Sequence, residues 1–158
     1  MFAIGDQVSY PMHGAGIIQK IEEKEILGEL RSYYIVHINH GNMDLMVPVL
    51  GCSEAGLRPI VKSSAIEGVW TALNAKSQKM DPNWNRRNRE NMDRLKTGEL
   101  SEIAGVIRDL VRADRIKKLS TGEKKLLSNA KIILASEMSM VLKKEESEIE
   151  QMIEEAIK

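Results

Sequence analysis

The hydrophobic pattern of this chain changes near residue 60, and this change limits its possible folds more than any other feature. Before that point, β-branched and aromatic residues gather in short runs separated by glycine-containing turns, which is typical of antiparallel strands. After it, apolar residues recur every three or four positions, which indicates amphipathic helices. The segment 57–60, which contains Pro59, lies between the two patterns. We therefore predict an α+β fold, with a β-sheet in residues 1–60 and a compact all-α bundle in residues 61–158.

Four strands are predicted in the first part, over residues 2–11, 14–22, 32–38 and 43–49. Short strands joined by tight turns favour a small, strongly bent antiparallel sheet or partial barrel of the Tudor or SH3 type. Pro48 has no backbone N–H to donate to a neighbouring strand, so we expect its strand at an edge of the sheet. An apolar edge strand is a place where another protein can add a strand.

Five helices are predicted in the second part, beginning near residues 63, 84, 100, 120 and 145. Two of them begin with a serine followed three residues later by a glutamate, which is the pattern of a capping box: Ser64 with Glu67, and Ser120 with Glu123. Trp70 falls within an apolar helical stripe, so we expect it to pack in the core. The last segment is acidic but carries apolar residues at helical spacing, so we expect it to pack back on the bundle.

The stretch 81–89 places an aromatic residue and a cluster of arginines at the start of a helix. Asn83 is a good N-cap, Trp84 follows it, and Arg86, Arg87 and Arg89 come next. This combination suits nucleic acid, because arginines bind phosphates while an aromatic ring packs on bases or wedges between them. Alternatively, Trp84 anchors this helix on another helix and the arginines form a solvated face. The stretch alone fits both interpretations.

The overall charge limits how the chain could bind nucleic acid. The sequence has 23 basic and 23 acidic residues and a formal net charge of +0, which excludes a histone-like binder that works by bulk charge. Any nucleic-acid surface must therefore be a local patch. Lys124, Lys125 and Lys131 could widen the basic face of 81–89, although solvated surface lysines are the simpler interpretation.

No catalytic or metal site is predicted. His13, His37 and His40 share the first part with Cys52, but their spacing fits no zinc pattern with paired ligands. The sequence has no Ser-His-Asp order, Walker loop or paired-carboxylate signature, so we expect no enzyme, no cofactor and no small-molecule substrate. A single cysteine fits a reducing compartment, and no apolar run is long enough to span a bilayer. We therefore expect a cytoplasmic protein without a membrane partner.

Three motifs resemble those of the CarD/CdnL family of bacterial transcription regulators. GDQVSYPMHG at residues 5–14 is similar to the family's opening GD-x-V-x-YP-x-HG. NWNRR at 83–87 is similar to NW-x-RR, and LSTGEK at 119–124 is similar to LS-x-GEK. The opening motif also occurs in the polymerase-interacting module of transcription-repair coupling factors. The resemblance is specific because all three motifs occur in this order, and it covers nearly the whole chain.

The resemblance implies that residues 1–60 form a Tudor-like module that binds the β subunit of RNA polymerase. The implied contacts fall on the strand positions Lys24, Met46 and Pro48. Some family members carry arginine where this chain has Met46. An apolar contact of the edge strand would then replace a charged one here.

The resemblance also implies that the helical part contacts promoter DNA at the upstream edge of the melted region and stabilises the open complex. Trp84 is the implied wedge in the minor groove, with Arg86, Arg87 and Arg89 on the nearby DNA backbone and Lys125 assisting. Such a protein would act in the cytoplasm, on the nucleoid, through RNA polymerase. The alternative is a protein–protein adaptor of the transcription machinery, whose arginines meet acidic side chains without direct DNA contact.

Overall fold

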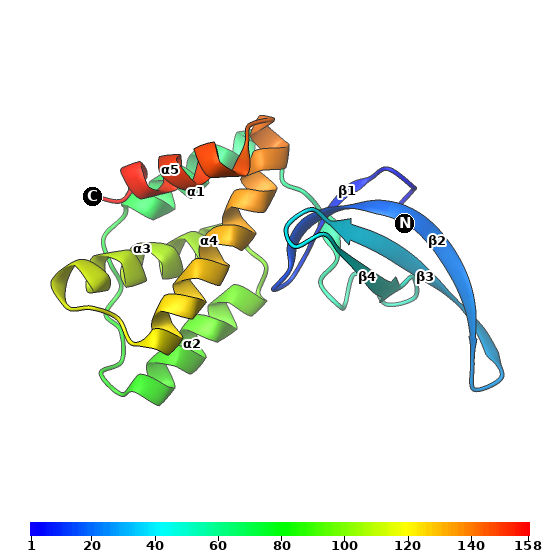
Figure 1. Cartoon of the computed structure of the whole chain (residues 1–158), viewed down its shortest axis with the longest axis horizontal. Coiled ribbons are helices and arrows are strands. Elements are labelled where there is room, and N and C mark those ends of the chain that lie inside the picture. The colour runs from blue at the N-terminus through cyan, green and yellow to red at the C-terminus, as the bar shows by residue number, and fades with distance from the viewer.

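The computed structural model describes residues 1–158 and consists of a β-sheet and a helical bundle that lie side by side along the long axis of the molecule (Figure 1). Five strands form the sheet: β1 (Gln7–Tyr10), β2 (Gly14–Ile26), β3 (Glu29–Ile38), β4 (Met43–Pro48) and β5 (Arg58–Pro59). Five α-helices form the bundle: α1 (Ile66–Asn74), α2 (Trp84–Lys96), α3 (Leu100–Ile116), α4 (Thr121–Leu142) and α5 (Glu146–Ala156). The predicted α+β fold, an antiparallel sheet followed by an all-α bundle, is confirmed.

The sheet is antiparallel throughout and has the strand order β4-β3-β2-β1-β5. β2 and β3 are the longest strands, and their outer halves form a curved arm that extends away from the helices (Figure 1). A register shift between Ile18 and Lys20 marks a β-bulge, which bends the strand and increases its twist. β4 lies at one edge of the sheet, as Pro48 predicts.

The β2–β3 arm is longer than the sequence pattern predicts. The expected strands stop at residue 22 and resume at residue 32, whereas the observed pairing continues to Ile26 opposite Glu29. The outer part of β2 is rich in charged side chains, so it lacks the alternation of polar and apolar residues from which strands are predicted. Leu27 and Gly28 form the two-residue turn, with φ angles of 53° and 80°. Positive φ at both positions is the signature of a type I′ hairpin turn.

The sheet has a small apolar core of its own on its inner face. Eight buried residues form it: Val8, Ile18, Tyr34, Val36, Ile38, Val47, Cys52 and Leu57. The Cys52 thiol is free and packs as a small apolar group. No group of three or more His, Cys, Asp or Glu side chains gathers closely enough to hold a metal ion.

The helical bundle contains the larger core, with 21 buried residues drawn from all five helices. α3 and α4 supply most of them, while α2 supplies only Leu95. The acidic α5 packs back on the bundle through Ile149 and Ile153, both fully buried, as predicted. Trp70 is partly buried against the same core, as its place in an apolar stripe predicts. None of the helices is both long enough and apolar enough to cross a lipid bilayer.

Two of the three predicted helix caps are confirmed. The Asn83 side chain accepts a hydrogen bond from Arg86 N at 3.1 Å, and Ser120 Oγ accepts one from Glu123 N at 3.2 Å. The capping box predicted for Ser64 is wrong, because residues 63–65 form a short 3₁₀ turn and the α-helix begins only at Ile66. That helix start has no side-chain cap.

The sheet and the bundle are joined by buried polar contacts to α4, which we call the junction contacts. The Glu137 carboxylate, 1% exposed, accepts two hydrogen bonds from Arg58, at 2.7 and 2.8 Å, and one from Val61 N at 2.9 Å. The residue before Glu137 also contacts the sheet: Ser136 Oγ accepts a hydrogen bond from Ala15 N at 3.0 Å. These contacts connect β2, β5 and Val61 directly to α4, so they fix the orientation of the sheet relative to the helices.

Candidate nucleic-acid interface

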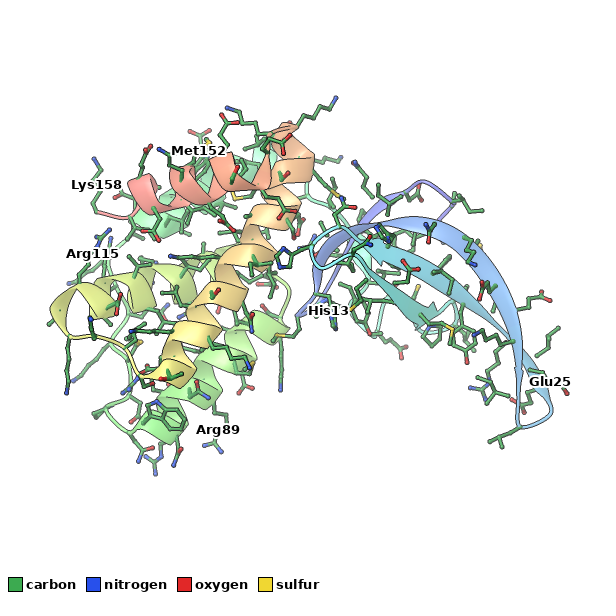
Figure 2. All side chains as sticks on the ribbon, in the orientation of Figure 1. His13, Glu25, Arg89, Arg115, Met152 and Lys158 are labelled. Atoms are coloured by element: carbon green, nitrogen blue, oxygen red, sulfur yellow. The ribbon has the colours of Figure 1, made fainter.

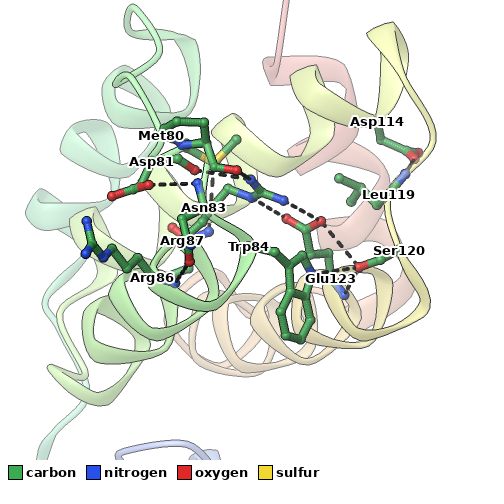
Figure 3. A network of polar contacts seen from close by, with 12 residues as sticks. Met80, Asp81, Asn83, Trp84, Arg86, Arg87, Asp114, Leu119, Ser120 and Glu123 are labelled. Carbon is green, nitrogen blue, oxygen red and sulfur yellow. Dashed lines mark hydrogen bonds and ion pairs between the residues drawn. The ribbon is translucent and has the colours of Figure 1, made fainter.

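Trp84 lies half exposed on the seam between α2 and α4. Its indole Nε1 donates a hydrogen bond to Ser120 Oγ at 3.1 Å, and its ring lies over Gly122 in the first turn of α4. The residue is nevertheless 45% exposed. The two interpretations of the sequence therefore combine: the indole anchors one helix on another and still presents part of its ring to solvent (Figure 3).

Gly122 is the residue that lets the indole lie so close to α4. A Cβ added at Gly122 would meet Cζ2 of the indole at 3.3 Å, which is a tight contact. The LSTGEK motif therefore has a structural meaning here. Its serine accepts the indole N–H, and its glycine leaves room for the ring.

Arg87 is committed to the protein itself. Its Nε and Nη2 donate to the two carboxylate oxygens of Glu123 at 2.9 and 3.2 Å, and its Nη1 donates to the carbonyl oxygens of Asp81 and Pro82 at 3.1 and 3.3 Å (Figure 3). The hydrogen bonds to Glu123 raise the pKa of the Arg87 guanidinium, and this effect outweighs its partial burial. These contacts occupy four of the five N–H groups of the side chain. The expected contact of Arg87 with the DNA backbone stays a prediction, and these bonds within the protein leave the side chain less free for it than those of Arg86 and Arg89.

A chain of polar contacts links Arg87 to the indole. Glu123 accepts from Arg87, Ser120 Oγ donates to Glu123 Oε1 at 3.3 Å, and the indole donates to Ser120. Glu123 is almost fully buried, with 6% of its side chain exposed. A buried carboxylate is tolerated when it is paired and hydrogen-bonded, and here both conditions are met. This chain of contacts holds Trp84 in one position.

The other predicted cations of this region are exposed and free of ion pairs. Arg86 and Arg89 lie on the solvent side of α2, and Lys125 lies with Lys124 near the start of α4. None of these four side chains forms a salt bridge within the protein. Figure 2 shows Arg89 projecting outward from the lower side of the helical bundle. Trp84 thus shares α2 with two exposed, unpaired arginines, and two exposed, unpaired lysines lie on α4, the helix on which its indole packs.

The sequence analysis missed two lysines beside Trp84. Lys117 and Lys118 lie in the loop between α3 and α4 and, with the indole, line an open groove of about 630 Å³. They are 33 and 34 positions from Trp84 in the sequence, and only the packing of α4 against α2 brings them close. The available signal was a pair of lysines directly before the LSTGEK motif.

The three residues implied in the polymerase contact share one face of the sheet. Lys24 pairs with Arg31, Pro48 with Tyr33 and Met46 with Ile35. Arg31, Tyr33 and Ile35 are every second residue of β3, so their side chains point to the same face of the sheet. The side chains of Lys24, Pro48 and Met46, which lie directly opposite them, point to that face too. All three predicted residues are exposed there. Glu25, which follows Lys24, lies far out on the arm, whereas Arg89 lies on the helical bundle (Figure 2).

Comparisons with known proteins relate both parts of the chain to the same kind of protein. Residues 2–61 match the family model described as the CarD-like/TRCF RID domain, and residues 68–154 match the CarD C-terminal domain. The Bacillus subtilis (strain 168) protein named "Putative transcription factor YdeB" is 41% identical over 142 residues, which are 89% of this chain and 92% of that protein. The solution NMR structure of the 72-residue N-terminal domain of Myxococcus xanthus CarD is 27% identical and covers 37% of this chain and 79% of that domain, with a TM-score of 0.33.

Proposed function

Because this chain belongs to the CarD family of transcription factors, we propose that it binds the β subunit of RNA polymerase and stabilises the promoter open complex. In this proposal residues 1–60 are the polymerase-binding domain and residues 61–158 the DNA-contacting domain. The protein is a CarD-family transcription factor, and proteins of this family are not enzymes. It would act in the cytoplasm, on the nucleoid.

The observation that carries the proposal is the half-exposed indole of Trp84 beside unpaired cations. A ring that is held at one edge by Ser120 and open at the other can enter a distorted minor groove without first changing its conformation. Arg86, Arg89 and Lys125 have no acidic partner in the protein, so they are free to bind phosphates. Arg87 does not take part in this contact and instead keeps the indole in place.

The sheet supplies the second half of the mechanism. Lys24, Met46 and Pro48 share an exposed face that ends at the edge strand β4, which suits a contact with a protein partner. Binding to polymerase through this face raises the effective concentration of the helical part at the promoter. A modest DNA-binding patch on a chain without net charge is then sufficient.

The free energy that Trp84 can contribute is small but sufficient to change the lifetime of the open complex. Stacking of an aromatic side chain on a base contributes about 1–3 kcal/mol in single-strand complexes. A difference of about 1.4 kcal/mol changes an equilibrium or a rate tenfold. Trp84 at the upstream edge of the bubble would therefore slow its collapse enough to matter at a weak promoter.

Replacing Trp84 with alanine tests this function. We expect Trp84→Ala to shorten the lifetime of the open complex, measured as the decay of polymerase–promoter complexes after addition of a competitor, by roughly 5- to 100-fold relative to the unsubstituted protein. Trp84→Phe is the matched variant, because it loses the indole N–H but keeps an aromatic ring, and it should retain part of the effect. Affinity for polymerase should be unchanged in both variants.

The protein–protein adaptor is the outcome that would replace this proposal. If Trp84→Ala leaves the lifetime unchanged, and a photoreactive residue at position 84 crosslinks to polymerase subunits rather than to promoter DNA, the helical part binds protein. A salt-sensitive crosslink from position 84 to promoter DNA in the presence of polymerase would support the wedge.

A further inference from the structure

We infer that the loop between α3 and α4 is a second phosphate-binding element, and that Lys117 and Lys118 bind the DNA strand opposite the one bound by Arg86 and Arg89. This inference rests on the proposed function, since it assumes that Trp84 enters a minor groove. We call Lys117 and Lys118 the loop lysines, and Arg86 and Arg89 the α2 arginines.

The first observation is that Trp84 separates these two groups of cations. The groove beside the indole is lined by both loop lysines, Leu119 and Ser120, whereas neither of the α2 arginines lines it. In the close view, Arg86 lies on one side of Trp84 and the Leu119–Ser120 segment on the other (Figure 3). The exposed ring thus lies between two positively charged segments that belong to different elements.

The second observation is that the loop lysines have no acidic partner. Both are exposed, and neither forms a salt bridge. Of the nearby carboxylates, Glu123 is paired with Arg87, while Asp114 and Asp81 accept backbone N–H groups, from Leu119 at 3.0 Å and from Asn83 at 2.8 Å, and form no salt bridge with either lysine. The positive charge on this side of the groove is therefore available to an external anion.

The third observation is that the loop is held in a defined position. Lys117 N donates to the carbonyl oxygen of Ala113 at 3.0 Å, and Leu119 N donates to Asp114. The next residue, Ser120, accepts the indole N–H. The loop lysines and the wedge are thus connected through a single short segment, so they can approach DNA as a unit without ordering of the loop.

The geometry of DNA explains why cations are needed on both sides of the indole. The minor groove is about 6 Å wide and is bordered by the phosphates of both strands. A ring inserted from that groove meets one backbone on each side, and cations on one side alone would hold only one strand. Ile116, which is 88% exposed next to the loop lysines, adds an apolar surface that can pack on deoxyribose. The combination of lysines with an exposed indole and an exposed isoleucine suits the sugar–phosphate backbone of duplex DNA, in which phosphates alternate with apolar sugar surfaces. An acidic peptide would use the lysines but not these apolar groups.

The test measures open-complex lifetime as a function of salt concentration, with polymerase, promoter and the full-length protein. The variant Lys117→Ala/Lys118→Ala should shorten the lifetime several-fold. In a plot of log lifetime against log salt concentration, its slope should be less steep by about 1–2, since each phosphate neutralised by the protein contributes about 0.9 to that slope. The matched control is Lys62→Ala/Lys76→Ala, which removes the same charge from exposed positions at the two ends of α1 and should have no such effect. If the two double variants behave alike, the inference is overturned.

Strand-specific crosslinking provides the second readout. A photoreactive residue at position 116 and one at position 89, each introduced alone, should crosslink to opposite strands near the upstream edge of the bubble. Crosslinks to the same strand, or none from position 116, would overturn the inference. The proposed function would survive that result if Trp84→Ala still shortens the lifetime. An unchanged lifetime with Trp84→Ala would instead overturn the proposed function and this inference with it.

Discussion

At the scale of single residues, the pairing of Arg87 with Glu123 determines what Trp84 can do. The two side chains are 20% and 6% exposed, and their bidentate contact joins α2 to α4 at the base of the indole. Charged partners in such a site depend on each other, because removal of one leaves the other buried without compensation. In the proposed function the pair would therefore act on DNA binding indirectly, by fixing the start of α2 relative to Ser120.

Substituting Glu123 separates this positioning role from a direct contact. Glu123→Gln keeps the shape of the side chain but leaves Arg87 facing a neutral amide, so we expect a loss of about 1–3 kcal/mol in the free energy of unfolding. It should also shorten the open-complex lifetime while leaving polymerase affinity intact. Glu102→Gln is the control, because Glu102 forms a more exposed pair with Arg94 and is 39% exposed. Chemical denaturation compares the two, and equal losses would contradict the positioning role.

These residues also mark the limit of what the sequence could predict about the site. The caps at Asn83 and Ser120 depend on contacts three residues apart, so local patterns predict them correctly. Arg86 and Arg87 look alike in the sequence, yet one is solvated and the other is bound to a glutamate 36 positions away. Nothing local distinguishes them, because the partner is supplied by the packing of another helix.

At the scale of elements, the β2–β3 arm has a turn whose sequence does not suit its backbone. Leu27 adopts φ 53°, a left-handed conformation that costs a non-glycine L-residue about 1–2 kcal/mol. Its side chain is 99% exposed, so no packing within the protein offsets this cost. Leucine followed by glycine is a weaker hairpin signal than asparagine followed by glycine. Together with the missing alternation in the outer part of β2, it explains why the sequence pattern ended the first strand too early and began the second too late.

The strain at this turn yields a prediction for the arm. Leu27→Asn should stabilise the protein by about 0.5–1 kcal/mol, because asparagine tolerates the left-handed conformation. Slower amide exchange in the outer halves of β2 and β3 should accompany the gain. Leu30→Asn is the control: it makes the same change at a position that is also exposed, at 68%, but lies within β3, where asparagine is unfavourable. A stabilisation by both substitutions would show that solubility, rather than turn geometry, is responsible.

At the scale of the whole molecule, the junction contacts make the sheet and the bundle one rigid unit. The face proposed to bind polymerase belongs to the sheet and Trp84 belongs to the bundle, and these two parts lie side by side along the long axis of the molecule (Figures 1 and 2). The orientation of the two parts is set by contacts near the middle, where α4 meets β2, β5 and the residues after β5. If the proposed function is correct, a small rotation there would move the indole away from the minor groove. The sequence predicted a boundary near residue 60, but it gave no sign that the linker itself carries Arg58 into a buried contact.

Weakening the junction should therefore uncouple the two proposed activities. Arg58 also donates to the carbonyl oxygen of Gly98 at 2.7 Å, and Arg58→Lys would lose the bidentate geometry while it keeps the charge. We expect Arg58→Lys to broaden the distribution of distances between labels on the arm and on α2, measured by single-molecule energy transfer, and to shorten the open-complex lifetime. Affinity for polymerase should stay the same, since the β2–β4 face is untouched. Arg31→Lys, in a salt bridge whose partners are 61% and 70% exposed, should change none of these quantities. A shorter lifetime without a broader distribution would mean that Arg58 acts in some way other than by fixing the orientation of the two parts.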